Sequence, residues 1–158
     1  MQPSAANAIS PAAIAPLVAA DYAQWAPLWR AYLDFYRAAV DAPTSETTFA
    51  RLTGGDEPMG GFLARAHDGA AIGLAHWILH RSCWTVGDYC YLQDLFVAAD
   101  RRGGGVGRLL IDAVAAKARA LGCSRVHWLT HETNLDAMRL YDKLAERSGF
   151  VQYRIRLD

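Results

Sequence analysis

A glycine-rich turn between a strand-like run and a helix-like run constrains this chain more than any other feature. Four glycines fall within the five residues Gly103–Gly107, directly after the apolar run Leu92–Val97 and before an amphipathic stretch. Such a turn exposes backbone N–H groups at a helix N-terminus, where the helix macrodipole also favours negative charge. Arginines at both ends, Arg102 and Arg108, favour a phosphate-binding loop over a flexible surface turn.

The two commonest phosphate loops do not fit this turn. A Walker loop requires Lys-Ser/Thr after its last glycine, whereas Gly107 is followed by Arg108-Leu109. A dinucleotide-binding fingerprint requires Gly-x-Gly-x-x-Gly, and counting from Gly105 places Leu110 at the third glycine. The sequence therefore predicts a phosphate loop of a different class.

The turn spells Arg102-x-x-Gly105-x-Gly107, which resembles the acyl-CoA pyrophosphate motif of the GNAT N-acetyltransferase superfamily. The run Leu92–Val97 resembles the central strand of that superfamily, and Trp128–Lys143, followed by Gly149-Phe150, resembles its second signature segment. The resemblance covers roughly Gly61 to Arg156. Its strand motif is most similar to the diamine (spermidine/spermine) N-acetyltransferases, which read Leu-Glu-Asp where this chain has Leu92-Gln93-Asp94.

Length and composition predict one domain over residues 11–158, after a mobile N-terminal segment at residues 1–10. Sixteen basic residues balance sixteen acidic ones among 158, so no global field recruits nucleic acid or an anionic membrane. Three cysteines without a Cys-x-x-Cys pair indicate reduced thiols and a cytoplasmic protein. The N-terminal residues lack the pattern of a signal peptide or a membrane span.

Hydrophobic periodicity predicts an α/β protein. The expected helices span Asp21–Ala39, Pro43–Leu52, Gly104–Leu121 and Asn134–Ser148. The expected strands span Ala12–Val18, Phe62–His67, Ala71–His80, Tyr89–Val97, Arg125–Thr130 and Val151–Arg156. Strand, glycine turn, helix and strand in succession indicate a right-handed parallel crossover inside a mixed sheet. The GNAT resemblance implies a mostly antiparallel sheet flanked by helices, splayed between the two parallel strands that end at Val97 and Thr130.

The resemblance implies that acetyl-CoA is the cosubstrate and lies in this gap. Its pantetheine arm would pair with the backbone of the first strand, and its pyrophosphate would lie on the N–H groups of the turn, where a Cβ would hold it off. The arginines would add charge-assisted contacts, and Asn134, an expected helix N-cap, would bond the arm. The implied cofactor-binding residues are Leu95, Phe96, Val97, Arg102, Gly103, Gly104, Gly105, Val106, Gly107, Arg108 and Asn134.

The resemblance also assigns Tyr141, two helical turns past Asn134, as the general acid that protonates the CoA thiolate. Gln93 replaces the glutamate that helps remove the amine proton in the diamine enzymes, so another base or a water relay is needed. Asp94 is the nearest carboxylate, although strand alternation points it away from the face of residue 93. Glu132 is a second candidate. Four extra residues between Tyr141 and Gly149 are expected to lengthen the helix by one turn.

We therefore expect an N-acetyltransferase that acetylates a primary amine by direct attack in a ternary complex, with small amines and polyamines favoured. A protein lysine or N-terminal acetyltransferase, and a non-catalytic acyl-CoA-binding regulatory module, are the alternatives. The expected partner is a small-molecule amine, and a homodimer is left open. No metal is expected, because His76 and His80 share a strand face near Cys83 without a fourth ligand at recognisable spacing, and they are interpreted as flanking the acceptor cleft.

Overall fold

The computed structural model describes residues 13–157, so the expected mobile segment at residues 1–10 lies outside the described residues. The described chain forms two compact units, one up to Trp128 and one from Leu129 onward. The single domain over residues 11–158 stays a prediction. Among the described residues, no helix is long and apolar enough to cross a membrane.

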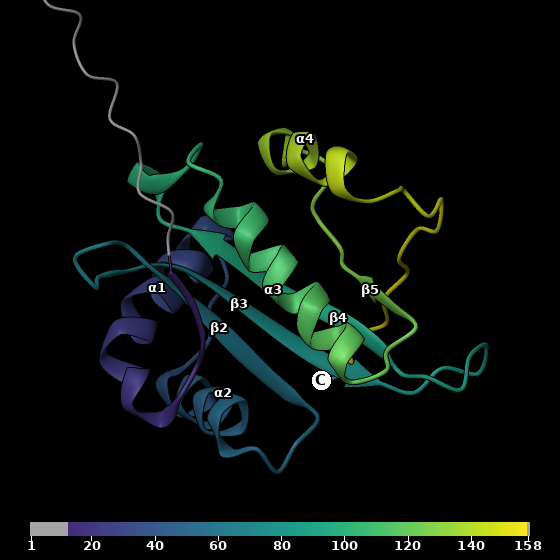
Figure 1. Ribbon diagram of the computed structural model, residues 1–158, viewed down its shortest axis with the longest axis horizontal. Helices are drawn as coiled ribbons and strands as arrows, with labels where there is room; N and C mark the ends of the chain where they lie inside the picture. Colours follow the sequence, from purple (N-terminus) through teal and green to yellow (C-terminus); the bar gives the residue numbers. More distant parts are fainter. Residues whose placement is uncertain (1–12, 158) are drawn as a thin grey trace, which may run out of the picture. The chain divides into compact units, whose positions relative to one another are not determined.

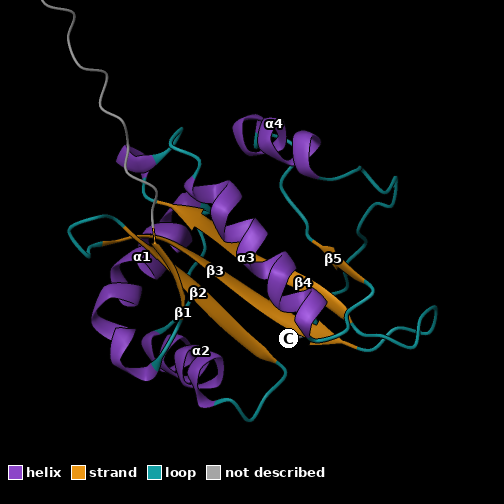
Figure 2. Ribbon diagram, viewed as in Figure 1, coloured by secondary structure: helices purple, strands orange, loops and turns teal. Residues whose placement is uncertain are grey.

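The first unit is built on a five-stranded sheet (Figures 1 and 2). Its strands are β1 (Ala13–Pro16), β2 (Met59–Arg65), β3 (Ala71–His80), β4 (Tyr89–Val97) and β5 (Arg125–His127). Its α-helices are α1 (Tyr22–Phe35), α2 (Ala42–Gly54) and α3 (Val106–Ala120). Strands neighbouring in the chain are neighbours in the sheet, antiparallel except for the parallel pair β4–β5. The predicted α/β GNAT fold with a mixed, mostly antiparallel sheet is confirmed.

Helices cover both faces of this sheet. On one face, which we call the α1 face, Trp25 of α1 and Phe49 of α2 pack with Leu63, Leu74 and Phe96 of the strands in a buried core. Helix α3 crosses the opposite face, and its buried side chains are Val106, Leu110, Ile111, Val114 and Ala118. Fully burying such side chains stabilises the fold by about 1.5–3 kcal/mol each.

Helix α3 lies close to β3 because Gly73 has no side chain. A Cβ at Gly73 would lie 2.9 Å from the carbonyl oxygen of Phe96 and 3.2 Å from Cδ1 of Leu110. The first of these contacts is shorter than real Cβ atoms show, and its partner is backbone that cannot step aside. The close packing of α3 against β3 and β4 fixes where its N-terminus, and therefore the glycine turn, emerges beside the end of β4.

Several element ends differ from the sequence expectation. Helix α1 ends at Phe35 rather than Ala39 because Arg37 adopts φ 51° and the Ala38 N–H bonds back to the carbonyl of Leu33. Helix α3 begins at Val106 rather than Gly104, because Gly103 (φ 81°) and Gly105 (φ 82°) take left-handed conformations.

The second unit contains α4 (Leu135–Leu144) and no strand among its described residues. The expected helix to Ser148 is wrong, because Ala145 is extended (φ −147°) and Arg147 folds back to bond both carboxylate oxygens of Asp142 at 3.0 and 2.8 Å. The extra residues before Gly149 therefore do not lengthen the helix. The expected strand Val151–Arg156 is also wrong, since its alternating pattern finds no ladder partner within the described chain.

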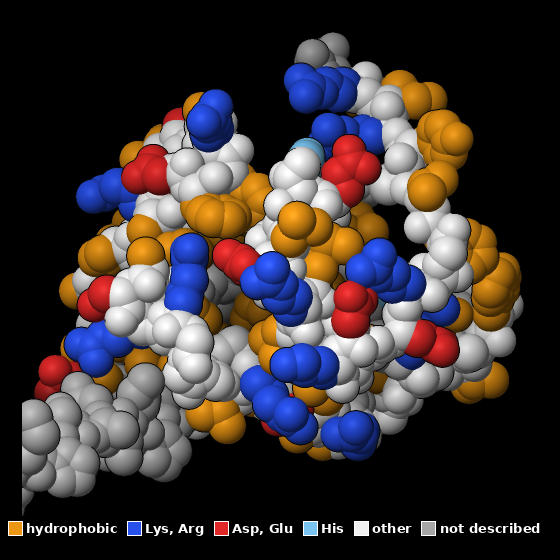
Figure 3. Space-filling view, turned by 90° about the horizontal axis from the view of Figure 1, so that it is seen from above, with side chains coloured by type: hydrophobic (Ala, Val, Ile, Leu, Met, Phe, Trp, Pro, Cys, Tyr) orange, Lys and Arg blue, Asp and Glu red, His pale blue; other side chains and the backbone are white. Residues whose placement is uncertain are grey.

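Charged side chains of both signs are interspersed on the face drawn in Figure 3. This distribution agrees with the zero formal net charge of the sequence.

Candidate active site

Strand β4 leaves one backbone edge unpaired over most of its length. The parallel pairing with β5 covers three positions and stops where Tyr91 faces His127, whereas β4 continues to Val97. No strand among the described residues pairs with this edge beyond Tyr91. The parallel pairing therefore ends at the Tyr91–His127 position, where β5 itself ends, and the splay expected up to Thr130 stays a prediction.

The hydrogen-bonding groups on this open edge come from alternate residues. The Ala98 N–H donates to the carbonyl of Ile72 on β3, so Phe96, two residues earlier, also directs its backbone groups toward β3. Leu95 and Val97 direct theirs the other way, to the open edge. Of the three residues predicted to pair with a pantetheine arm, Leu95 and Val97 thus have the required backbone orientation, and Phe96 does not.

The glycine turn places unused N–H groups beside the end of β4. The N-cap of α3 is Gly105, which has no side chain to cap the helix, and the first main-chain bond of the helix runs from the Leu109 N–H to the Gly105 carbonyl at 3.1 Å. The N–H groups of Val106, Gly107 and Arg108 precede that bond and have no acceptor within the helix. A helix N-terminus whose N–H groups have no acceptor, at the positive end of the helix dipole, is suited to binding an anionic group.

The flanking arginines already have partners within the protein. Arg102 donates from Nε to the carbonyl of Val97 at 3.0 Å, and its guanidinium carbon lies 5.2 Å from the Phe35 ring centre and 5.6 Å from that of Phe96. Arg108 lies 3.7 Å from the Asp112 carboxylate in an exposed pair. The structure thus assigns Arg102 a role in holding the end of β4, and its terminal nitrogens stay available to a phosphate.

A β-bulge interrupts β4 at Gln93. His76 of β3 pairs with Asp94, but the next residue, Trp77, pairs with Leu92, which leaves Gln93 as the extra residue. Tyr91 pairs with Ile78 and Asp94 with His76, and these partners are two residues apart on β3. Tyr91 and Asp94 consequently share the α1 face, although they are three residues apart. The bulge therefore breaks the simple alternation along β4 from which the direction of Asp94 was expected.

Asp94 is the centre of a buried hydrogen-bond network on the α1 face. The Tyr32 hydroxyl donates to Oδ1 at 2.7 Å, and His76 Nδ1 lies 2.9 Å from Oδ2. Trp25 donates its indole N–H to His76 Nε2 at 2.9 Å. Because an indole can only donate, Nε2 of His76 carries no proton, and the imidazole is neutral with its proton on Nδ1, directed at Asp94.

This network sets the charge state around the bulge. Each of the two Asp94 carboxyl oxygens has one side-chain partner, Tyr32 on Oδ1 and His76 on Oδ2. Burial, together with the charge of Asp94, raises the pKa of Tyr32 above its usual range, and the same two causes raise the pKa of Tyr91. Both phenols therefore keep their protons at neutral pH. Asp94 is only 8% exposed and both of its carboxyl oxygens are hydrogen-bonded, so its structural role is to hold the bulge in place.

The remaining predicted residues lie in the second unit. Asn134 is the N-cap residue of α4, as expected, although its side chain makes no capping bond and donates from Nδ2 to the Thr130 hydroxyl at 3.3 Å. Tyr141 lies in the last turns of α4, where its carbonyl accepts the Ala145 N–H at 2.9 Å. The assignments of Asn134 and Tyr141 to the site stay predictions.

Sequence reasoning missed Trp25, Tyr32 and His127, all on the α1 face. From the sequence, Trp25 and Tyr32 resemble ordinary core residues, because helical periodicity does not show whether their polar atoms meet a buried side chain or solvent. His127 lies on the shortest strand of the sheet, and its closeness to His80 follows only from the pairing of β3, β4 and β5.

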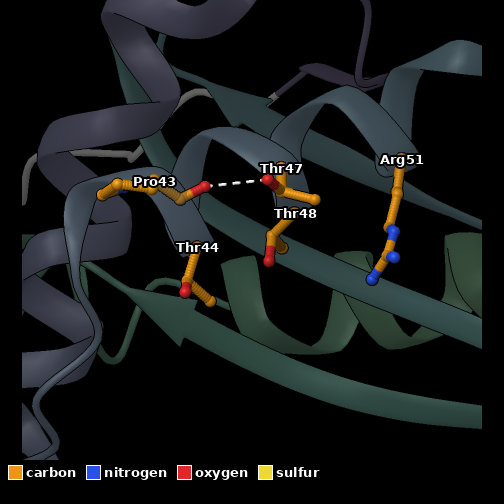
Figure 4. Close-up of a pocket in the computed structure, with 5 residues that line it drawn as sticks. All are labelled: Pro43, Thr44, Thr47, Thr48 and Arg51. Atoms are coloured by element: carbon orange, nitrogen blue, oxygen red, sulfur yellow. Dashed lines mark hydrogen bonds between the residues drawn. The ribbon is translucent and has the colours of Figure 1, made fainter.

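An open hollow of about 300 Å³ lies on α2, lined by Pro43, Thr44, Thr47, Thr48 and Arg51 (Figure 4). The Thr47 hydroxyl donates to the Pro43 carbonyl at 2.8 Å, within the same helix. All of its lining residues come from one helix and none is fully buried, so it lacks the convergent polar groups of a reaction site.

The mixed sheet with its parallel pair and the glycine turn before α3 are those expected of an acyl-transferring enzyme, and comparison with known proteins agrees. The model of the acetyltransferase (GNAT) family matches residues 25–145. The chain belongs to the GNAT family and is an N-acetyltransferase.

Two curated relatives and one solved structure illustrate the range of similarity. A D-amino-acid N-acetyltransferase of Saccharomyces cerevisiae is 36% identical over 85% of this chain and 84% of its own length. The thialysine N-epsilon-acetyltransferase of Mus musculus is 34% identical over 52% of this chain and 49% of its own. The structure of AAC(6')-Iy in complex with a CoA-containing bisubstrate analogue superposes with a TM-score of 0.80 at 22% identity, covering 94% of this chain and 100% of that one.

Proposed function

We propose that this enzyme transfers acetyl from acetyl-CoA to the primary amine of a small molecule. The observation that carries the proposal is the open edge of β4 leading into the uncapped N-terminus of α3. The N–H and C=O groups of Leu95 and the N–H of Val97 would bond an extended amide-containing arm, and the first turn of α3 would receive its pyrophosphate. The fold is shared with a protein solved with a CoA-containing analogue, which supports the choice of acyl donor.

The acceptor class rests on chemistry and on relatives. The curated relatives include enzymes named for D-amino acids, ornithine N5 and thialysine, each of which offers a primary amine on a small molecule. Polyamines are further candidate acceptors, because the Leu92-Gln93-Asp94 strand motif resembles that of the diamine N-acetyltransferases. The amine nitrogen would attack the thioester carbonyl directly, the C–S bond would break, and Tyr141 would give its proton to the departing thiolate.

The test is CoA release followed with a thiol reagent, using acetyl-CoA and a panel of D- and L-amino acids, ornithine, thialysine, putrescine and spermidine. Lysine-containing and free N-terminal peptides form the comparison set. Turnover with a small amine well above that with peptides supports the proposal, and preferential turnover of peptides would favour a protein acetyltransferase. Acetyl-CoA binding without release for any acceptor would favour the non-catalytic alternative, for which Gln93 in place of a glutamate is the one supporting feature.

A further inference from the structure

The proposed reaction needs a group that removes the proton of the acceptor ammonium, and Gln93 cannot do so. At pH 7 an alkylammonium with a pKa near ~10 is almost fully protonated, and freeing its lone pair costs about 4 kcal/mol by any route. A route is still required, because the nitrogen must lose the proton before or during attack. Asp94, the nearest carboxylate, already accepts from Tyr32 and His76.

A pair of histidines lies at the position where the parallel strands part. Nε2 of His80, the last residue of β3, lies 2.9 Å from Nε2 of His127, the last residue of β5. His127 stacks on the Tyr91 ring, with ring centres 5.1 Å apart and planes at 18°. His80 shares the α1 face with His76, because they are four residues apart on a regular strand. The pair therefore lies on the same face as Asp94.

The hydrogen bonds of the pair fix the positions of its protons. Nδ1 of His80 lies 2.9 Å from the carbonyl oxygen of Arg81, which can only accept, so Nδ1 carries the proton. In a neutral His80, Nε2 is then an acceptor, and the proton between the two rings belongs to Nε2 of His127. Nδ1 of His127 consequently holds a lone pair, and no hydrogen-bond partner for it exists among the described residues.

The environment of His127 favours its neutral form at pH 7. Burial lowers the pKa of His127 below its usual 6.5, and repulsion from the positive charges of Arg125 and of protonated His80 lowers it further. From β4 it meets only the rings of Tyr89 and Tyr91, and α3, which packs against β5, carries its cations Lys117 and Arg119 in its last turn. No carboxylate is among the groups that shift this pKa.

The position of the pair relative to β4 matches the place of the reaction. From Leu92 to Val97 the open edge extends about 20 Å, with the pyrophosphate cradle at its Val97 end. An arm running from the cradle along this edge brings its thioester toward the opposite end, beside Tyr91, Gln93 and His127. The exposed Gln93 amide at the bulge can hold a water or the amine there, without taking up a proton.

Resting on the proposed function, we propose that His127 is the general base of this enzyme and that His80 positions it. The acceptor ammonium gives a proton to Nδ1 of His127, directly or through one water, and the freed lone pair attacks the thioester carbonyl. The imidazolium that forms keeps its Nε2–H bond to His80 and gives the proton on Nδ1 to solvent after acyl transfer, which restores the starting tautomer. When the C–S bond breaks, its electron pair leaves with the thiolate; the nitrogen loses its second proton as the amide forms and the thiolate gains one, so the single proton released per turnover is the one that His127 held.

The primary test compares His127→Gln with wild type, using the best amine of the panel and saturating acetyl-CoA. Glutamine keeps a donor for His80 but cannot act as the base. We expect kcat/KM at pH 7 to fall about 10²-fold, acetyl-CoA affinity to stay within twofold, and activity to rise with pH toward the wild-type value as free amine becomes abundant. Added imidazole should partly restore the rate at pH 7. His67→Gln, in the β2–β3 turn, is the matched control and should change nothing.

His80→Phe provides a second, independent variant, because it keeps a ring against Tyr89 at an exposed position and removes the acceptor for His127, together with the bond to the Arg81 carbonyl. We expect kcat/KM to fall about tenfold and the acid limb of its pH profile to shift. The base assignment alone would be overturned if the wild-type enzyme turns over an amine and His127→Gln retains both more than half of the wild-type kcat/KM and the wild-type pH profile. If His127→Gln does not fold, an unchanged pH profile in His80→Phe overturns it. Absence of wild-type turnover with every amine would instead overturn the proposed function.

Discussion

His76 Nδ1 donates to Asp94 Oδ2 at 2.9 Å across the β3–β4 pair, at the last register position before the bulge at Gln93. Through Trp25 and Tyr32, the same network connects α1 to β4, the strand with the open edge. Four polar groups are thus satisfied in one buried network, and loss of any one leaves a partner unpaired. The bulge is therefore held in place from the β3 side of β4, which is the side opposite to the open edge.

Asp94→Asn should lower the free energy of unfolding by about 1–3 kcal/mol, because the amide nitrogen must face a donor, either the Tyr32 hydroxyl or the His76 N–H. Urea denaturation followed by tryptophan fluorescence measures this change. Tyr32→Phe removes one bond only and should cost less. If Asp94→Asn leaves stability unchanged and raises KM for a diamine more than KM for acetyl-CoA, then Asp94 belongs to the amine site rather than to the anchor.

Gly107→Ala should weaken acetyl-CoA binding at least tenfold, or about 1.4 kcal/mol, because a methyl group in the first turn of α3 holds the pyrophosphate off its N–H groups. Alanine suits a helix better than glycine, so the fold should be retained. Calorimetric titration gives the affinity. Gly54→Ala at the end of α2, where a Cβ meets nothing within 4 Å, is the control. Gly105→Val is less informative, since φ 82° strains any side chain there. Unchanged affinity in folded Gly107→Ala would remove this turn from the site.

Tyr141→Phe should lower kcat about 10²-fold with acetyl-CoA affinity nearly unchanged, because phenylalanine keeps the ring and cannot protonate the thiolate. A thiolate is a tolerable leaving group, so we expect the lower end of the usual range for acid–base groups. Pre-steady-state acetylation must first establish that chemistry limits the rate. A variant that keeps more than half of wild-type kcat under that condition would make Tyr141 structural.

The stability of the protein should fall as the pH drops below 6.5, and His127 should contribute to that fall. Because its pKa is lower in the folded protein, the unfolded chain takes up a proton near pH 6.5 that the folded chain does not bind until lower pH. The free energy of unfolding therefore rises with pH across this window, above the range near 4 where carboxylates titrate. In His127→Gln the slope between these limits should be smaller than in wild type, as urea titrations at closely spaced pH values would reveal. Equal slopes would show that burial of His127 costs the imidazolium nothing.

Local sequence was sufficient to predict β3, β4, the glycine turn and most of α3. The alternation of β3, the Asp68-Gly69 turn before it and the apolar stripe of α3 are all local patterns, and backbone preferences act over the same few residues. The parallel crossover followed from chain order and handedness. The family resemblance then identified the turn as a site for a pyrophosphate.

Prediction was weakest at the end of the chain. The stretch Val151–Arg156 alternates as a strand would, yet a strand also needs a neighbour for its backbone groups, and alternation carries no information about that neighbour. The end of α4 depended on the reach of Arg147 to Asp142, a bond between side chains that helical propensity does not encode.

The sequence by itself determined the fold class, the family and the place of the glycine turn before α3, because glycines, apolar periods and helix ends act through neighbouring residues. Only the tertiary structure decided the hydrogen-bond partners of Asp94 and the pairing of His80 with His127. A one-residue bulge at Gln93 reverses every later side chain of β4, and the two histidines are joined across three strands from positions 47 residues apart. Both outcomes arise from strand register, which is set by the packing of the whole sheet against α1 and α3.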